Sequence, residues 1–157
     1  MHLTHGMIQD LKAVSEMSTR KGWEYAGNFK IGYRGITYTT SKKRMSVDVE
    51  ECDFHTHPGI PGNYVTLPSN ADFRSGQVHI LGDNLGYYVI KVYTNNVSDN
   101  VMDGVRRDPF LRRRQVSDRG MEYFMATLPE WKNFINHELN PYLLSLHGVD
   151  LKYHGYG

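Results

Sequence analysis

The stretch that most restricts the fold of this chain is Asp53 to Ser75, "DFHTHPGIPGNYVTLPSNADFRS". Residues 58–68 are so rich in proline and glycine that neither a strand nor a helix continues for long through them. We therefore predict an exposed loop here. The alternating residues 45–57 predict a long strand before it, and Ser69 is a good N-cap for a helix that runs to about residue 82.

The N-terminal part reads as a helix followed by strands. Apolar residues at spacings of three and four predict an amphipathic helix over residues 4–19, with Thr4 as its N-cap. Residues 23–40 are rich in aromatic, Ile and Thr residues and predict two strands joined by a tight turn. Residues 86–94, "GYYVIKVYT", give the clearest strand pattern in the chain.

The C-terminal part is predicted to be mainly helical. Residues 96–117 are rich in Asn, Asp and Arg and predict a long surface insertion loop. Residues 118–157 predict two helical segments, broken at Pro129 and again near Pro141, and a short tail. This order of elements predicts one α+β domain over residues 1–157 with a mostly contiguous sheet.

Composition excludes several classes of protein. The formal net charge is only +1, and aspartates dilute the arginine-rich run from Arg106 to Arg119, so a nucleic-acid partner is not expected. The single cysteine, Cys52, excludes an internal disulfide and any cysteine-based zinc cluster, and it suits an intracellular compartment. The sequence has no long apolar run, so neither a signal peptide nor a membrane span is expected.

His55 and His57 are candidate metal ligands. Alternate residues of a strand share a face, and their Cα atoms lie about 6.5–7 Å apart, so two imidazoles can converge on one ion. After the loop, Asp72 can add a carboxylate and leave a fourth position for water, which is the open coordination that a catalytic zinc needs.

The same residues also have a purely structural interpretation. Ser69 followed three residues later by Asp72 resembles a capping box at a helix start. A single His-x-His pair is more often structural than metal-binding. Both interpretations stay open at the level of the residues alone.

"HTHP" followed by "PSNADFRS" resembles the signature of the JAMM metalloproteases, the MPN+ class of MPN domains. That signature is a Glu, then His-Ser/Thr-His-Pro, a loop and Ser-x-x-Asp. The match extends to Pro58, Pro68 and Ser75 and covers residues 1–95 by motif order. One departure is the loop, because eleven residues separate His57 from Ser69 where the family commonly has seven.

The resemblance implies roles for individual residues. His55, His57 and Asp72 would hold one Zn²⁺, and Ser69 would help to orient the water and to stabilise the tetrahedral intermediate. The family also needs a glutamate that accepts a proton from that water. We assign this role to Glu24, whose context "WEYAGNFKIG" resembles the corresponding stretch of the family.

Three other glutamates compete with Glu24 for the role of general base. Glu51 shares the face of the histidines but lies four strand residues, about 13 Å, from His55. Its neighbour Glu50 is on the same strand, and Glu16 falls within the first helix.

The resemblance also implies a fold and a function. The fold would be MPN-like, that is cytidine-deaminase-like, with a curved mixed sheet flanked by helices. The expected activity is a zinc-dependent isopeptidase or peptidase that removes ubiquitin or a ubiquitin-like protein, in a cellular, viral or phage-encoded setting. The insertion could bind a partner, and Tyr64 and Val65 could touch the substrate.

Two alternatives remain beside this expectation. The chain could be a non-catalytic MPN scaffold in a homodimer, a larger complex or a virion, or an arginine-rich nucleic-acid binder. Retained metal ligands argue against the first, and the near-zero net charge argues against the second.

Overall fold

The computed structural model describes residues 3–157 except 30–35, 41–51, 74–77, 96 and 98–99. The first helix, α1, spans His5–Lys21. It begins after Thr4, whose hydroxyl oxygen accepts a hydrogen bond from the Met7 N–H at 3.2 Å, and it ends at Gly22 in a left-handed conformation with φ 70°. The predicted first helix and its N-cap are confirmed.

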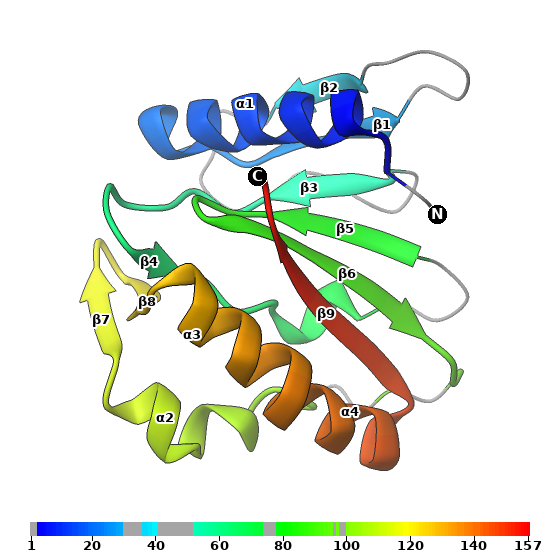
Figure 1. The fold of residues 1–157 in the computed structure, drawn as a ribbon, viewed down its shortest axis with the longest axis vertical. Coiled ribbons are helices and arrows are strands. Elements are labelled where there is room, and N and C mark those ends of the chain that lie inside the picture. Colours follow the sequence, from blue (N-terminus) through cyan, green and yellow to red (C-terminus); the bar gives the residue numbers. More distant parts are fainter. Residues whose placement is uncertain (1–2, 30–35, 41–51, 74–77, 96, 98–99) are drawn as a thin grey trace.

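Strands of the described part of the chain form a main sheet of six, with the order β2-β1-β3-β5-β6-β9 (Figure 1). Their bounds are β1 Tyr25–Phe29, β2 Ile36–Thr40, β3 Phe54–Thr56, β5 Val78–Gly82, β6 Gly86–Val92 and β9 Val149–Gly155. β3 and β5 run parallel, and the other neighbouring pairs run antiparallel. The sheet is therefore mixed, and the two strands predicted in residues 23–40 and the strand predicted in residues 86–94 are confirmed. The tight turn predicted between the first two lies outside the described residues.

The two faces of this sheet bury two separate apolar clusters. One cluster packs Leu11 and Val14 of α1 against Phe54 and Ile80. The other includes Leu81 and belongs to the opposite face, because successive strand residues alternate. α1 lies along β1 and β2 at one end of the molecule, and α3 and α4 lie along β6 and β9 at the other (Figure 1).

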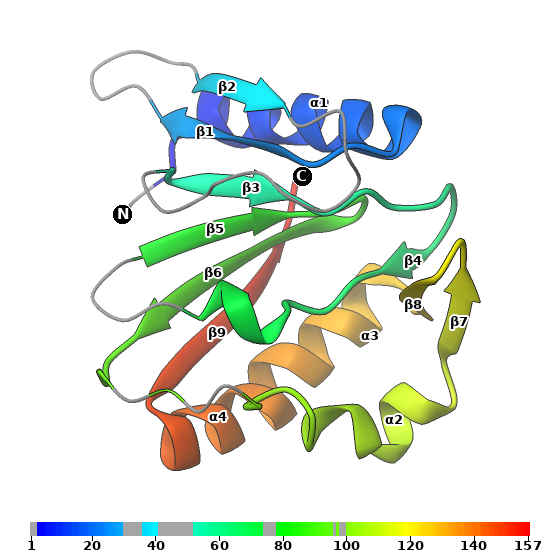
Figure 2. The same cartoon turned by 180° about the vertical axis from the view of Figure 1, so that it is seen from behind.

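A second, smaller sheet within the described residues has the order β4-β8-β7. Its strands are β4 Tyr64–Val65, β7 Gln115–Asp118 and β8 Met121–Met125. Seen from behind, the chain that follows β4 crosses over β6 (Figure 2), and the Tyr88 hydroxyl on β6 donates to the Thr66 carbonyl at 2.5 Å. The loop predicted to be exposed over residues 58–68 therefore contains a short strand, and its residues 65–68 are buried because they pack against the main sheet.

The segment predicted as a surface loop, residues 96–117, contributes to the core. It contains a 3₁₀ turn η2 at Val105–Arg107 and a short helix α2 at Pro109–Arg112. Met102 and Leu111 are fully buried. The composition concealed this because a few apolar residues anchor the segment while the many charged residues between them stay exposed.

The C-terminal region differs from the prediction at its start, at both prolines and at the tail. Residues 121–125, predicted to be helical, form strand β8, because they pair with β4 and β7. α3 Leu128–Asn133, a π-helical segment η3 at Phe134–Leu139 and α4 Asn140–His147 follow one another directly. Pro129 occupies the first turn, where its missing N–H costs nothing, and Pro141 follows the π-helical turn at the start of α4. The expected tail is strand β9, whose alternate residues Val149, Leu151 and Tyr153 are buried.

The predicted helix from Ser69 to residue 82 is wrong. Among the described residues of this stretch, one 3₁₀ turn, η1 at Asn70–Asp72, follows the cap, and residues 78–82 form strand β5. The capping signal was real, but "VHILG" is more stable between β3 and β6, where it completes both hydrogen-bond ladders. Of the long strand predicted over residues 45–57, the structure describes strand only at Phe54–Thr56.

The whole chain is one α+β domain with a mixed sheet and few helices. Of the helices in the described ranges, none has the length and apolar character needed to cross a membrane.

Candidate metal centre

Strand β3 places His55 and His57 on one face of the main sheet. Phe54 packs into the cluster under α1, and the Thr56 hydroxyl donates to Ser18 of α1 at 2.9 Å, so the residues between the histidines face the other way. His55 is only 2% exposed, and His57 is partly buried. The predicted alternation is confirmed.

Asp72 on the 3₁₀ turn η1 contacts both imidazoles through its carboxylate. Its Oδ1 lies 3.1 Å from His55 Nε2, and its Oδ2 lies 3.6 Å from His57 Nε2. Ligand atoms arranged in a tetrahedron at about 2.0–2.1 Å from a zinc ion lie about 3.3–3.4 Å apart. The two observed distances lie close to this value, one to each carboxylate oxygen, so Asp72 lies where it could share a metal ion with these imidazoles.

Glu24 stands beside this trio, just before strand β1. β1 pairs with β3, with Ala26 opposite His55, and this pairing brings Glu24 Oε1 to 3.9 Å from His57 Nε2. One ligand atom from each of Glu24, His55 and His57 lies within 4.8 Å of the others, so these residues could also hold a metal ion. The structure therefore brings together four side chains that the sequence suggested.

Of the three competing glutamates, the structure describes Glu16. Glu16 lies on α1 and is exposed. Glu50 and Glu51 lie outside the described residues, as does Ser75 of the motif.

Burial controls the charges in this site. It lowers the pKa of His57 to about 4, against an opposing effect of Asp72, so this imidazole is neutral and has a free lone pair at neutral pH. Burial alone would raise the pKa of Asp72, but His55, His57 and the Ser69 N–H hold it well below its usual range. A neutral imidazole beside an ionised carboxylate is the protonation pattern that metal ligation requires.

Glu24 has a different environment from Asp72. Burial raises its pKa to about 7, while the nearby His55 lowers it and the charge of Asp72 raises it further. The pKa values of the two carboxyl groups of the site therefore differ widely. Asp72 is ionised at neutral pH, whereas Glu24 gains and loses a proton near neutral pH.

The second ring nitrogen of each histidine has a partner that the sequence did not reveal. His55 Nδ1 lies 2.6 Å from Nε2 of His79, and His57 Nδ1 lies 3.3 Å from the Thr66 hydroxyl. From the sequence alone we interpret His79 as a structural or surface residue, because no spacing connects it to the other two histidines. Recognising residues 78–82 as a strand next to β3 would have placed it on the histidine face.

Thr66 is itself held by a buried polar network. Its N–H donates to Asp83 Oδ2 at 3.4 Å, and its carbonyl accepts from Tyr88. Asp83 Oδ1 accepts from the Tyr153 hydroxyl at 2.5 Å, and the Tyr88 hydroxyl accepts from the Trp131 indole N–H at 2.8 Å. The strand β9 and the helix α3 thereby fix the position of a residue that contacts the site.

The other predicted site residues, Ser69, Val65 and Tyr64, differ in how far their side chains are exposed to solvent. Ser69 is partly buried, and its backbone N–H donates to Asp72 Oδ2 at 2.8 Å, which is the carboxylate half of the predicted capping box. The side chain of Val65 is 1% exposed and belongs to the core, out of reach of a substrate. Tyr64 lines a cavity of about 600 Å³ together with Arg113, Met125, Glu130 and their neighbours.

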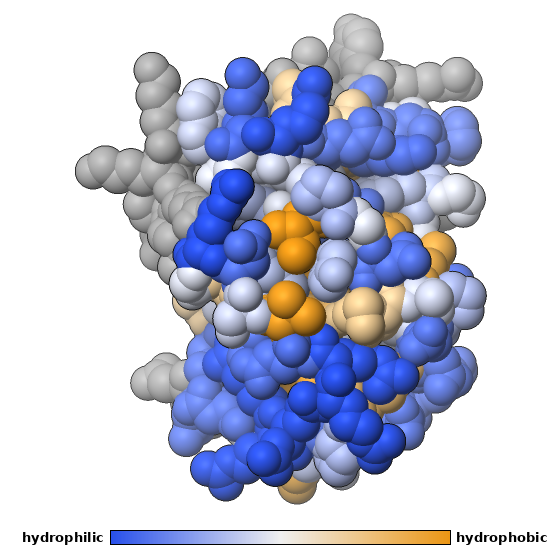
Figure 3. All heavy atoms as spheres, turned by 90° about the vertical axis from the view of Figure 1, so that its left-hand side faces the viewer, coloured by the Kyte–Doolittle hydropathy of each residue, from blue (hydrophilic) through white to orange (hydrophobic). Residues whose placement is uncertain are grey.

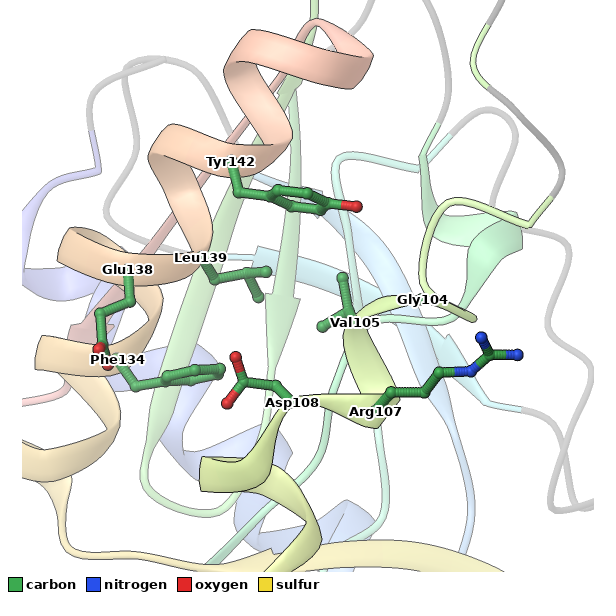
Figure 4. A pocket seen from close by; sticks show the side chains of 8 residues that line it. All are labelled: Gly104, Val105, Arg107, Asp108, Phe134, Glu138, Leu139 and Tyr142. Atoms are coloured by element: carbon green, nitrogen blue, oxygen red, sulfur yellow. The ribbon is translucent and has the colours of Figure 1, made fainter.

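A second cavity lies where the insertion packs on the C-terminal helices. It measures about 380 Å³ and has Val105, Phe134 and Leu139 among its lining residues. Figure 4 shows the Arg107 guanidinium pointing away from it, while Asp108 and Glu138 lie at its edge. Its lining contains neither histidine nor cysteine, so it does not resemble the site around His55.

The outer face that carries α2 and β7 is strongly hydrophilic in its lower part (Figure 3). Arg106 on the 3₁₀ turn η2 forms an ion pair with Glu122 at 3.1 Å, and Arg114 forms one with Glu130 at 3.0 Å. These ion pairs neutralise part of the arginine-rich run.

Comparison of the chain with protein-family models, with curated proteins and with solved structures found no match. The resemblance to the JAMM metalloproteases therefore rests on the motif residues alone.

Proposed function

We propose that this protein is a zinc-dependent peptidase or isopeptidase in which His55, His57 and Asp72 hold the metal. One observation carries the proposal: both imidazoles direct Nε2 at the same carboxylate, at 3.1 and 3.6 Å. A hydrophobic core gains nothing from three polar side chains gathered in this way, whereas a metal ion neutralises and ligates all three.

The donor set favours zinc over other common metals. Two imidazole nitrogens and one carboxylate oxygen suit Zn²⁺, while Ca²⁺ and Mg²⁺ prefer an all-oxygen shell. Three protein ligands leave one position open, as in catalytic zinc sites. We treat Glu24 as a neighbour of the metal rather than as a ligand, in line with its pKa near 7.

In the proposed mechanism, zinc supplies the Lewis acidity that polarises a water molecule and the scissile carbonyl. Glu24 accepts a proton from the attacking water and later delivers it to the leaving amine. The Ser69 hydroxyl donates a hydrogen bond to the developing oxyanion. Asp72 would stay ionised throughout, because its carboxylate would ligate the metal and accepts a hydrogen bond from the Ser69 N–H.

The substrate class follows from the motif rather than from the fold. By the likeness of "HTHP" and "PSNAD" to the JAMM signature, we propose a conjugate of ubiquitin or a ubiquitin-like protein and an MPN-like arrangement of the domain. The loop of residues 58–68, which contacts His57 through Thr66, and the insertion of residues 96–117, which contacts η1 through Asn70, would carry the substrate contacts.

The decisive variant is Glu24→Gln, which keeps the shape of the side chain but cannot accept a proton. We expect it to bind one zinc per chain and to lose about 10²–10⁴-fold in kcat on ubiquitin-like isopeptide conjugates. Metal content by mass spectrometry and cleavage of a panel of such conjugates are the two measurements. Glu16→Gln, the same change on the exposed side of α1, is the matched control and keeps full activity.

Full activity in Glu24→Gln would remove the assignment of the general base. A wild-type chain that binds zinc, cleaves none of the conjugates and purifies in a large stable complex would instead identify the non-catalytic scaffold.

A further inference from the structure

We propose that His79 is a positioning residue for the metal: it accepts the Nδ1 proton of His55 and so keeps the His55 Nε2 lone pair available for ligation. The inference rests on the proposed function, since it concerns the same metal site. It adds a residue that the motif does not contain.

The sheet explains why His79 reaches His55 across 24 residues of sequence. β3 and β5 run parallel, with His55 opposite Leu81. His79 is two residues before Leu81 and therefore faces the same side of the sheet as His55, one step along the neighbouring strand. The ring centroids are 4.8 Å apart, and His79 is only 5% exposed.

The contact between these rings restricts the tautomer of His55. The two nitrogens are 2.6 Å apart, so one must donate and the other must accept. A metal at His55 Nε2 needs the lone pair on that atom, so a neutral imidazole carries its proton on Nδ1. His79 Nε2 is then the acceptor, which is the role that carboxylates and carbonyls play behind other metal-bound histidines.

The opposite arrangement would disable the site. A proton on His55 Nε2 would point at Asp72 Oδ1, 3.1 Å away, and occupy the position that the metal needs. Without an acceptor at residue 79, the His55 Nδ1–H would also lie unsatisfied beside buried side chains, which is costly. His79 therefore favours the tautomer that ligates metal.

Substitutions at His79 test this role by zinc affinity, measured by competition with a chromophoric chelator. His79→Leu removes the acceptor, and we expect zinc to bind about 10–100-fold more weakly. His79→Gln places an amide oxygen near the position of Nε2, and we expect its affinity to return to within a few-fold of wild type. His154→Leu, at an exposed strand histidine that stacks on Tyr87, is the control and leaves affinity unchanged.

Each result supports or overturns the inference. Wild-type affinity in His79→Leu, or equal loss in His79→Leu and His79→Gln, would overturn it, because the hydrogen-bond acceptor would then not be the feature that matters. If His79→Leu does not fold by circular dichroism, His79→Asn replaces it: this amide is one carbon shorter, and we expect the same weak binding. A wild-type chain without zinc affinity would instead refute the metal site itself, so the two failures are distinguishable.

Discussion

At the residue scale, each candidate ligand histidine is fixed at both ring nitrogens. Nε2 faces the site, and Nδ1 contacts His79 in one case and Thr66 in the other. The contact to Thr66 is longer, at 3.3 Å, but Thr66 has little freedom because its N–H and carbonyl are held by Asp83 and Tyr88. We therefore expect the side chains at Nδ1 of each ligand to control how well the site is organised.

Thr66→Val tests this control of His57. The change removes the hydroxyl but keeps the shape and the two backbone hydrogen bonds, so we expect zinc to bind about 10-fold more weakly with little loss of stability. Chelator competition gives the affinity, and urea denaturation gives the free energy of unfolding.

The matched control is Thr56→Val, on the face of β3 opposite to His55 and His57. Its hydroxyl accepts from the Tyr25 N–H at 3.0 Å and donates to Ser18, away from the metal site. We expect it to lower the free energy of unfolding by about 1–3 kcal/mol and to leave the zinc affinity of the folded protein unchanged. Weaker zinc binding in Thr56→Val together with unchanged zinc binding in Thr66→Val would contradict the assignment of Thr66, rather than Thr56, to the metal site.

At the element scale, the β5–β6 hairpin is organised around one buried carboxyl group. Asp83 Oδ1 accepts from the N–H groups of Leu85 and Gly86 and from the Tyr153 hydroxyl. Burial nevertheless raises the pKa of Asp83 to about 6, although these hydrogen bonds lower it. The tyrosines that face it, Tyr88, Tyr153 and Tyr156, are themselves neutral because burial raises their pKa values.

This raised pKa predicts a pH dependence of stability. The pKa is 3.8 without the fold and about 6 within it, so the folded state binds the proton more tightly. The stability that Asp83 contributes is therefore fully present below about pH 4 and is lost as the pH rises through about 6. The loss between about pH 4 and pH 7 is about 2 kcal/mol.

Asp83→Asn isolates this effect, because an amide of the same shape does not titrate. The difference in free energy of unfolding between zinc-free wild type and Asp83→Asn is expected to shift by that amount across this range, in favour of the variant at high pH. Urea denaturation at a series of pH values measures it. A difference that stays constant with pH would show that Asp83 has an ordinary pKa.

At the scale of the whole molecule, the site joins segments that are distant in the sequence. Glu24 precedes β1, the histidines lie on β3, Asp72 lies on η1, and the C-terminal strand β9 reaches the site through Tyr153 and Asp83. A metal bound there can exist only when these segments are assembled. Zinc binding is therefore linked to global folding.

Zinc is expected to raise the free energy of unfolding by about 4 kcal/mol at a free concentration a thousandfold above Kd. Asp72→Asn replaces the anionic ligand with a neutral amide and should lose most of this shift. Thermal unfolding with and without zinc measures it. Asp103→Asn, at an exposed carboxylate that contacts Asn70 and Arg106, is the matched control and keeps the full shift; an unchanged shift in Asp72→Asn would exclude Asp72 as a ligand.

The sequence by itself determined the elements and residues whose signals are local. Such signals, which depend on neighbours a few residues away, predicted the first helix with its Thr4 cap, the strands within residues 23–40 and 86–94, the shared face of His55 and His57 and the cap at Ser69. The alternation of residues along a strand and the residue types of a helix cap can be recognised without knowing which distant segment packs against them.

Only the tertiary structure decided what depended on pairing between distant segments. Residues 78–82 became a strand because β3 and β6 offered hydrogen bonds on both sides, and residues 149–155 became the edge strand because β6 was open to pairing. His79 and Thr66 joined the histidines for the same reason: strand pairing and loop packing bring side chains together that no sequence spacing connects. Candidate ligands could thus be found from spacing, whereas the side chains that orient them became visible only once the sheet was assembled.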